Sequence, residues 1–352
     1  MIEPKAYVKD LFRTMPRQRS GYLRMDMNES VDGLPADFIR KTLNKVDPEF
    51  IAKYPEYDSL VKKIAEHDKI NPENIALANG SDAAIKNIFD AYISAGDKVL
   101  VTDPTFAMYP IYCKMFSANA ILVGYRRDLE FPYDNFIDKL SDGIKMAVVV
   151  NPNNPAGSVM DRQSLLLMIK KAEEKEILLI IDEAYFYYYP ETMIGEVKNH
   201  RNLIVLRTFS KLCGMAAVRL GYAAAHPDIV ETLRRVRPTF DINGLAVLLA
   251  EELLDHSEVI AQAVETFNCG KRYLIKKLLA SGIKYREGRA NFVLVDCGER
   301  ADEVIKSLAE KKILLHDRFK QDFLKDYLRV SVGSEKVMVR FWDVFHSIWE
   351  GK

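Results

Sequence analysis

Short, continuous apolar segments alternate with amphipathic segments along the chain from about residue 72. The apolar segments are rich in Val, Ile and Leu and do not alternate with polar residues, which is typical of strands buried on both faces. We expect six such strands, at 74–78, 97–102, 146–150, 177–182, 203–208 and 219–225. Between them, apolar residues recur at helical spacing, for example in 82–93 and 161–175. This alternation predicts an α/β fold whose large sheet is mostly parallel and has helices on both faces.

The pattern changes after about residue 245. A long helical segment is expected over 245–281, and short strands are expected over 291–296 and 327–333. The last segment of the chain has one apolar face at helical spacing. The members of this face are Met338, Phe341, Trp342, Phe345, Ile348 and Trp349. These elements predict a smaller α+β domain that packs on the first.

The length of 352 residues is typical of one large domain and one smaller domain. We therefore predict an N-terminal arm over 1–28, a large domain over 29–245 and a small C-terminal domain over 246–352. Hydrophobic residues make up 48% of the chain, which is ample material for a core. Fifty basic residues balance fifty acidic ones, so no net field favours nucleic acid or an anionic membrane as a partner.

The four cysteines, Cys113, Cys213, Cys269 and Cys297, are scattered and form no CxxC pair. We interpret them as free thiols in a reducing compartment, and we expect no metal site. The N-terminal segment is charged and lacks the apolar core of a signal peptide, and no apolar run is long enough to span a membrane. The sequence therefore predicts a cytoplasmic globular protein.

Polar clusters follow the predicted strands of the large sheet, at the edge where ligands bind in sheets of this kind. After the first strand, Gly80 permits a tight turn, and Ser81 and Asp82 open a helix whose free amides can bind an anion. After the second strand, Phe106 lies in a loop above the sheet. Each feature alone has an ordinary structural explanation, as a helix cap or as core filler.

Four more polar residues follow the later strands. Asn154 lies in the rigid turn NPNNPAG, which does not need its side chain, so the amide is available to a ligand. Asp182 ends a strongly apolar strand, where an unpaired carboxylate would be costly, and a cationic ring nitrogen is one candidate partner. Lys211 lies at the mouth of a buried strand, with Arg219 eight residues later. A lone lysine there normally reaches water, but the ordered set of residues at one sheet edge indicates a ligand site.

The motifs G-S-D, P-T-F, N-N-P-A-G, D-E-A-Y and S-K-x7-R occur in this order along the chain. They resemble those of the fold-type I pyridoxal-phosphate enzymes, and most of all the histidinol-phosphate aminotransferase group. The resemblance covers nearly the full chain, from Asn28-Glu29 through Tyr54-Pro55 to Y-L-R-V-S-V-G near the C-terminus. It implies an aminotransferase that uses pyridoxal 5'-phosphate. The expected reaction moves an amino group between an amino-acid donor, glutamate by resemblance, and a small phosphorylated keto compound.

The resemblance also implies roles for the residues around the cofactor ring. Lys211 would form the Schiff base with the cofactor aldehyde and, once displaced by the substrate, carry a proton between substrate and cofactor carbons. Asp182 would pair with the pyridine nitrogen and keep it protonated. Asn154 and Tyr185 would hydrogen-bond the phenolic oxygen of the ring. Phe106 would stack on the ring face, where this family often has a tyrosine.

The cofactor phosphate would be bound by a helix N-terminus, a hydroxyl group and an arginine. The implied residues are Ser81 and Asp82, Thr208 or Ser210, and Arg219. Tyr54 would reach this phosphate from the neighbouring subunit, so the resemblance implies a homodimer with shared active sites. The alternative for Tyr54 is a structural role as an aromatic residue before proline.

The substrate side departs from the family. Arg329 would bind an α-carboxylate of the substrate if it has one, with Asn28 and Asn291 on the same side. In histidinol-phosphate aminotransferases a phosphate-binding arginine lies 13 residues earlier, and here that position is His316. Arg318, two residues later, could replace this arginine only if its side chain reached the phosphate from a different backbone position. We expect His316 either to cap a strand or to make a weaker, pH-sensitive contact in the distal pocket, which would make histidinol phosphate a poor substrate.

Two other functions fit parts of the pattern. Decarboxylases of threonine phosphate and serine phosphate resemble the same group, and the cofactor motifs do not distinguish their reaction from transamination. A transcription regulator with an aminotransferase-like domain would need an added helix-turn-helix segment. The chain has no room for one before Asn28 and no basic surplus, so we expect an enzyme.

Overall fold

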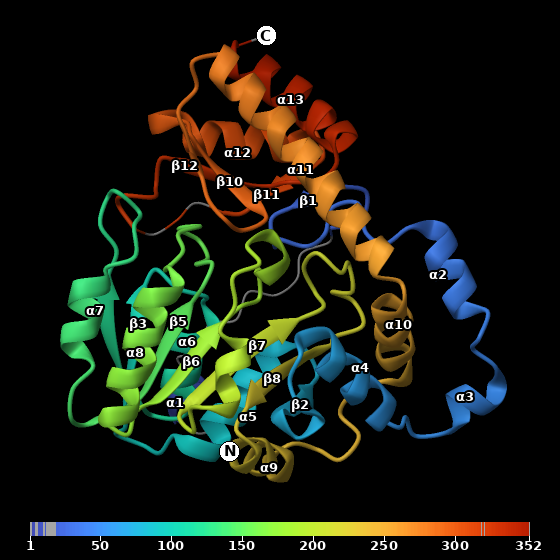
Figure 1. Cartoon of the computed structure of the whole chain (residues 1–352). Coiled ribbons are helices and arrows are strands. Elements are labelled where there is room, and N and C mark those ends of the chain that lie inside the picture. Colours follow the sequence, from blue (N-terminus) through green and yellow to red (C-terminus); the bar gives the residue numbers. More distant parts are fainter. Residues whose placement is uncertain are drawn as a thin grey trace.

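A seven-stranded sheet forms the centre of the computed structural model, which describes residues 2–3, 6–9, 11, 19–317, 319 and 321–351 (Figure 1). The strands are β2 (Ile75–Ala78), β3 (Lys98–Asp103), β4 (Asn119–Gly124), β5 (Ile144–Val150), β6 (Leu178–Asp182), β7 (Leu203–Thr208) and β8 (Gly221–Ala225). Their order is β2-β8-β7-β6-β5-β3-β4. Only β8 runs against its neighbours, β2 and β7, so the expectation of a mostly parallel sheet is confirmed.

Helices cover both faces of this sheet (Figure 1). One face packs against α4 (Asp58–Asp68), α7 (Tyr133–Lys139), α8 (Arg162–Glu174) and α10 (Gly244–Asp255). The other face packs against α5 (Ser81–Tyr92), α6 (Met108–Met115) and α9 (Pro227–Val236). Successive residues of a strand enter opposite cores, as Ala147 and Val148 of β5 do. This two-sided burial is the reason that the central strands are apolar at most positions.

All six strands predicted for the sheet are present within a few residues of the expected bounds, whereas β4 is missing from the prediction. It pairs only with β3 and lies at the edge of the sheet. Five of its six residues are exposed or only partly buried, and Leu122 is 51% exposed. An edge strand of this kind lacks the buried apolar run by which the other strands were recognised.

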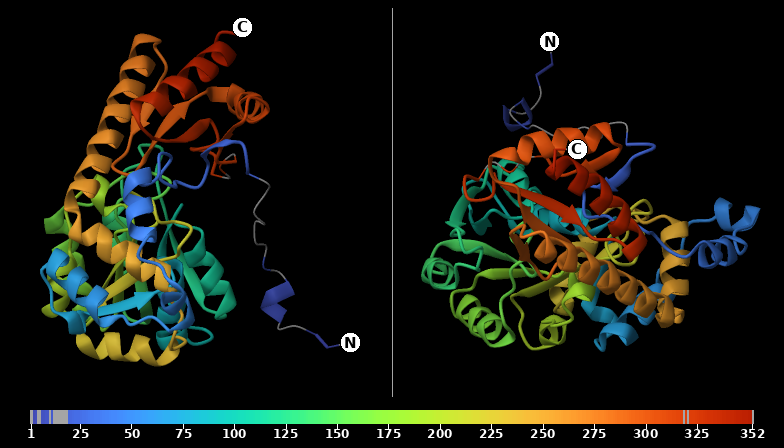
Figure 2. Two further views of the ribbon diagram at one scale, coloured as in Figure 1. Left: turned by 90° about the vertical axis from the view of Figure 1, so that its right-hand side faces the viewer. Right: turned by 90° about the horizontal axis from the view of Figure 1, so that it is seen from above.

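A second core lies toward the C-terminus (Figure 2). The antiparallel sheet β12-β10-β9 contains β9 (Tyr285–Glu287), β10 (Phe292–Asp296) and β12 (Tyr327–Ser331). It packs with α11 (Ser257–Ala280), α12 (Ala301–Glu310) and α13 (Glu335–Trp349). The helix predicted over 245–281 is in fact two, because the chain leaves helical geometry at His256, between α10 and α11. The apolar face of α13 is confirmed, with Met338, Phe341, Trp342 and Phe345 buried.

The N-terminal part of the chain is joined to this second core. β1 (Leu23–Met25) pairs in parallel with β11 (Ile313–Leu315), and Met25 is fully buried there. The end of the predicted arm over 1–28 is therefore part of the C-terminal structure. The chain then passes to α2 (Ala36–Leu43) and α3 (Pro48–Ala52), which project from the body (Figures 1 and 2). The domain boundaries at 28 and 245 stay a prediction.

Within the described part of the chain, no helix has both the length and the apolar character needed to span a membrane. The four cysteines are free thiols. Three of them, Cys113, Cys213 and Cys297, are buried, and burial raises the pKa of each thiol to about 12.

Candidate active site

Most of the polar residues identified from the sequence lie together along one edge of the large sheet, the edge formed by the carboxyl ends of its parallel strands. β2, β3, β5, β6 and β7 all run toward this edge, and the antiparallel β8 starts from it. The C-terminal sheet lies on the same side (Figure 1). Contacts between the two parts confirm this arrangement, because Arg329 of β12 donates a hydrogen bond to Asn154 in the turn after β5.

The first cluster is a cradle of hydrogen-bond donors around the N-terminus of α5. Gly80 has φ = 80°, and a Cβ atom there would lie 2.5 Å from Nη2 of Arg219. A Cβ atom on Gly221 would lie 2.5 Å from the backbone nitrogen of Ser81. Gly80 therefore leaves room for Arg219 beside the first turn of α5, and Gly221 is required for the close approach of β8 to the backbone of this turn. Arg219 itself adopts φ = 59° and donates through Nη1 to Oγ of Ser210 over 3.3 Å.

Thr208 lies below this cradle at the end of β7. Its Oγ1 accepts a hydrogen bond of 3.1 Å from the backbone nitrogen of Ser210 and lies 3.4 Å from the carbonyl of Leu220. The cradle thus combines the free amides of a helix N-terminus, a guanidinium and a hydroxyl group. This set of donors suits a phosphate dianion.

Asp182 is the buried acid of the site. It ends β6 with 3% exposure, and its Oδ2 accepts a hydrogen bond of 2.8 Å from the hydroxyl of Tyr109. Its Oδ1 accepts one of 3.1 Å from the backbone nitrogen of Ala184. Burial raises the pKa of Asp182 to about 6, although both hydrogen bonds and the charge of Lys211 act in the opposite direction. A cation placed on this carboxylate would be bound in a low-dielectric environment.

Tyr185 is held by two amides, one from each side of the site. Asn28 Nδ2 and Asn154 Nδ2 donate to its hydroxyl oxygen over 2.9 and 3.0 Å. Arg329 donates to Oδ1 of Asn154, and Ser331 donates to Oδ1 of Asn28. These bonds fix the orientation of both amides. Because Tyr185 accepts both bonds, its own proton is available for a further acceptor. Burial raises its pKa, so the phenol stays protonated at neutral pH.

Lys211 lies in the turn after β7. Its Nζ donates to the carbonyl of Met27 over 3.2 Å. Desolvation lowers the pKa of Lys211 to about 8, and the charge of Arg329 acts in the same direction, while Glu29 and Asp182 oppose it. An amine with this pKa is partly neutral near pH 7–8, which is the state that attacks a carbonyl carbon.

The predicted substrate side contains three buried polar residues. Arg329 is 6% exposed and donates to Asn154 Oδ1 over 2.7 Å and to the carbonyl of Asp26 over 2.6 Å. Its Nε has no hydrogen-bond partner among the described residues. Asn291 Nδ2 donates to the carbonyl of Asn28 over 2.9 Å, which joins β10 to the same cluster.

His316 lies near Arg329 but makes local contacts. Its Nδ1 is 2.5 Å from the carbonyl of Asp317, and its ring stacks on Phe319 at 4.9 Å. Desolvation and, less strongly, the charge of Arg329 lower the pKa of His316 to about 4. The pH-sensitive contact expected from the sequence would therefore titrate at acidic pH, and His316 is neutral near pH 7. Arg318 lies outside the described residues.

Two of the predicted cofactor residues are less enclosed. Phe106 is partly buried and packs edge-on against Tyr109 with ring centroids 6.2 Å apart. Tyr54 is 74% exposed and stacks on Phe240 at 4.2 Å. Tyr54 follows α3, in the segment that projects from the body (Figure 2).

The sequence did not reveal two residues that shape this site. Tyr109, which binds Asp182, lies three residues after Phe106 in α6, and helical spacing was its only signal. Arg19 forms a bidentate contact with Glu29 and also binds Asp26. No motif marks Arg19, because its partners are brought to it by the fold. Among the described residues, no group of three or more His, Cys, Asp or Glu could hold a metal ion.

Known proteins resemble this chain in sequence and in fold. A histidinol-phosphate aminotransferase from Thermoanaerobacter sp. (strain X514) is 35% identical over 315 residues, covering 88% of each chain. The structure of histidinol-phosphate aminotransferase from Sinorhizobium meliloti in complex with pyridoxal-5'-phosphate superposes with a TM-score of 0.88, at 21% identity and 99% coverage of both chains. L-threonine-O-3-phosphate decarboxylase from Porphyromonas gingivalis has a TM-score of 0.76 at 22% identity, covering 93% of this chain and 98% of its own.

At these identities the two structural neighbours establish the fold, which is confirmed as the fold-type I architecture expected from the sequence. The family assignment comes from the sequence comparisons. The family model of aminotransferase class I and II matches residues 22–345. The chain therefore belongs to the class I and II aminotransferases and is a pyridoxal-phosphate-dependent transaminase.

Proposed function

We propose that the polar cluster described above, which includes Asp182, Lys211 and Arg329, is the active site. Lys211 is the residue that binds the cofactor aldehyde. The observation that carries this assignment is the match between the donor set and the cofactor. The cradle of Arg219 and the first turn of α5 suits its phosphate, and the buried carboxylate of Asp182 suits its ring nitrogen. When bound, the cofactor supplies an electron-withdrawing ring that stabilises negative charge on the substrate carbon next to nitrogen.

The carboxylate of Asp182 stabilises the positive charge of the ring nitrogen that would contact it. Tyr109 and the amide of Ala184 hold the carboxylate oxygens in place from the protein side. A cationic nitrogen in contact with Asp182 would lower the pKa of this acid from its raised value, so the carboxylate is ionised in the complete enzyme. Its negative charge is then compensated without help from water.

Tyr185 and Asn154 recognise an oxygen on the ring. The phenolic proton of Tyr185 is available because its oxygen already accepts two hydrogen bonds. Arg329 orients the amide of Asn154, so the same arginine serves both the cofactor side and the substrate side of the site. Phe106, three residues before Tyr109, contributes an apolar face against the ring.

Lys211 is the proton carrier. With a pKa near 8, the free amine can accept a proton from the substrate carbon and return it to another carbon within reach. The neighbouring positive charges of Arg329 and Arg219 keep this amine from holding a proton too tightly.

Arg329 binds the anionic group of the substrate. Two of its hydrogen bonds go to Asn154 and the carbonyl of Asp26, and the rest of its guanidinium is available to a ligand. His316, neutral near pH 7, offers no second positive charge at the position where relatives of the histidinol-phosphate group carry arginine. We therefore propose a smaller phosphorylated or polar amino compound as substrate, and glutamate as the amino donor.

The active form is a homodimer with shared sites. Tyr54 and Phe240 form an exposed aromatic pair, and Ile51 in the same projecting segment is 65% exposed. Large apolar groups exposed together mark an interface. In an isologous dimer each Tyr54 reaches the phosphate cradle of the other subunit.

A panel of substrates tests the reaction. The purified enzyme is incubated with single amino donors, including glutamate, and with phosphorylated amino acids and ketones. Formation of the 2-oxo acid and release of carbon dioxide are measured separately. Transfer of the amino group without carbon dioxide supports the proposal, whereas carbon dioxide release from a phosphorylated amino acid would assign the decarboxylase reaction instead.

A further inference from the structure

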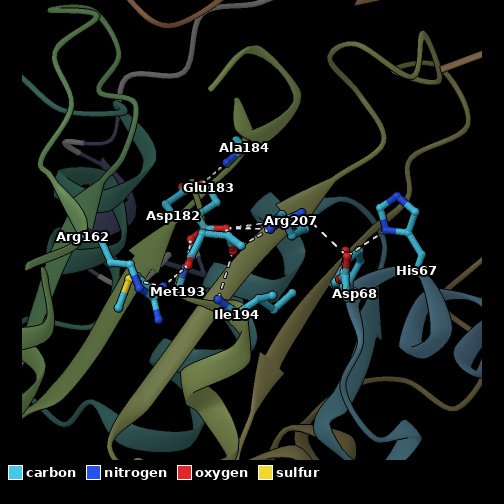
Figure 3. A network of polar contacts seen from close by, with 11 residues as sticks. His67, Asp68, Arg162, Asp182, Glu183, Ala184, Met193, Ile194 and Arg207 are labelled. Carbon is cyan, nitrogen blue, oxygen red and sulfur yellow. Dashed lines mark hydrogen bonds and ion pairs between the residues drawn. The ribbon is translucent and has the colours of Figure 1, made fainter. Parts of the chain in front are cut away.

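A buried network of charged residues lies next to the proposed active site, beneath the end of β6 (Figure 3). Glu183, Arg207 and Asp68 form its centre, and their side chains are 1%, 5% and 2% exposed. Glu183 lies in the D-E-A-Y motif but has no role assigned above, and Arg207 and Asp68 lie outside the quoted motifs. Two carboxylates and one guanidinium are costly to bury, so the fold retains them against an energetic penalty.

Arg207 joins the two chain segments that carry Asp182 and Lys211. Its Nε and Nη2 contact the same oxygen of Glu183 over 2.9 and 2.8 Å, and Glu183 directly follows Asp182. Arg207 itself lies in β7, four residues before Lys211. The pair is therefore a side-chain link between the segments that hold the acid and the amine.

The link is rigid because every part of it has several contacts. The two carboxylate oxygens of Glu183 also accept hydrogen bonds from Met193 N at 2.7 Å and Thr192 Oγ1 at 2.6 Å. The guanidinium carbon of Arg207 lies 3.4 Å from the ring centre of Phe186, which follows Tyr185. Arg207 thus contacts two residues of the segment after Asp182, Glu183 through an ion pair and Phe186 through its ring.

The pair also sets the charge beside Asp182. Glu183 is one of the groups that raise the pKa of Asp182, and Arg207 is the cation that compensates Glu183. Asp68 lies on the far side of Arg207, with 3.8 Å between Oδ1 and Nη1, and is further bound by Tyr222 and His67. The pair therefore contributes to the charge around Asp182, together with Lys211 on the other side.

We propose that Glu183 and Arg207 are a positioning pair that fixes the placement and the charge of Asp182 relative to Lys211. This inference rests on the roles proposed above for those two residues. It assigns a function to two buried residues that do not touch the cofactor themselves.

The test uses the visible absorbance of the cofactor-bound enzyme, titrated with pH. Removing the negative charge in Glu183→Gln should lower the titration midpoint, and removing the positive charge in Arg207→Gln should raise it. Each shift should be on the order of one pH unit, as for a charge within about 10 Å at an effective dielectric constant near 20. The double variant should return to within about 0.3 units of wild type, because the two charges cancel.

Controls separate this electrostatic role from a merely structural one. Arg162→Gln and Glu196→Gln change a second ion pair that borders the same loop, with 2.5 Å between the two side chains, and they should leave the midpoint unchanged. Arg207→Lys keeps the charge but loses the fork, so it should keep the midpoint near wild type while weakening cofactor binding about tenfold. If Arg207→Gln does not fold, Arg207→Lys still tests the role of Arg207 through its effect on cofactor binding.

Shifts of the same sign in both single variants, or no shift beside a lowered melting temperature, would overturn the proposal. The result is distinct from a failure of the proposed function. If Lys211→Ala retains the visible band, the assignment of Lys211 is wrong. If that band is lost in Lys211→Ala but Glu183→Gln leaves its midpoint in place, only the inference about the pair is wrong.

Discussion

Arg329 donates a hydrogen bond of 2.7 Å from Nη1 to Oδ1 of Asn154, and so joins the C-terminal sheet to a turn of the large sheet. This bond turns the amide nitrogen of Asn154 toward the hydroxyl of Tyr185. A second bond from Nη2 to the carbonyl of Asp26 connects the same arginine to the N-terminal segment. One side chain therefore aligns three parts of the chain around the proposed site.

Replacement of Arg329 by lysine should lower kcat/KM by about a hundredfold. Lysine cannot make both protein contacts and also bind an anion in a forked geometry. The loss of two charge-assisted hydrogen bonds costs roughly 3 kcal/mol in transition-state stabilisation. Steady-state kinetics measures this effect, with Arg300→Lys as the control, because Arg300 contacts the carbonyls at the end of α13. Equal activities of the two variants would show that Arg329 has no special role.

The raised pKa of Asp182 predicts a pH dependence of stability in the cofactor-free protein. The folded form binds this proton more tightly than the unfolded chain, so the contribution is complete below about pH 4 and is lost as the pH rises through about 6. The change is roughly 3 kcal/mol in the free energy of unfolding.

Urea unfolding of wild type and Asp182→Asn between pH 4 and 7 measures this contribution as a difference. The stability difference between the two proteins should vary with pH over this range. A constant difference for Asp182→Asn would mean that the acid has an ordinary pKa.

The exposed pair of Tyr54 and Phe240 predicts a dimer with active sites shared between subunits. Tyr54→Phe should leave the dimer intact and weaken cofactor binding about tenfold, because one hydrogen bond to the phosphate is lost. Light scattering gives the oligomeric state, and equilibrium dialysis of the cofactor gives the affinity. A fully active monomer at the assay concentration would refute the shared site.

The neutral His316 predicts weak use of histidinol phosphate. His316→Arg should raise kcat/KM for histidinol phosphate roughly thirtyfold, which corresponds to about 2 kcal/mol from one charge-assisted contact. A short polar amino substrate without a phosphate serves as the control and should gain nothing. A wild-type enzyme that already prefers histidinol phosphate, and gains nothing from arginine, contradicts this prediction.

The strands and the residues at their ends could be predicted because burial leaves a strong local pattern. Strands such as β5 and β6 are covered on both faces, and their residues are apolar apart from Lys145 in β5 and the terminal Asp182 in β6. The polar residues that follow them, including Asn154 and Asp182, contrast with these runs and share one edge of the sheet. Strand β4 left no such pattern because it is exposed at the edge.

Contacts between distant segments could not be predicted in the same way. Tyr109 meets Asp182, and Arg207 meets Glu183, only after the helices and strands have packed. Arginine in a strand and tyrosine in a helix are common in many unrelated environments. Their partners are determined by tertiary structure, so a single sequence gives no spacing rule for them.

The central claim is that Lys211 binds the cofactor, and reductive trapping tests it most directly. The holoenzyme is treated with borohydride, digested and analysed by mass spectrometry to find the lysine that carries the reduced cofactor. The account predicts labelling of Lys211, and it predicts that Lys211→Ala folds, is colourless and loses turnover by several orders of magnitude, while Lys198→Ala is unchanged. Cofactor on another lysine, or near wild-type turnover in Lys211→Ala, would contradict the account.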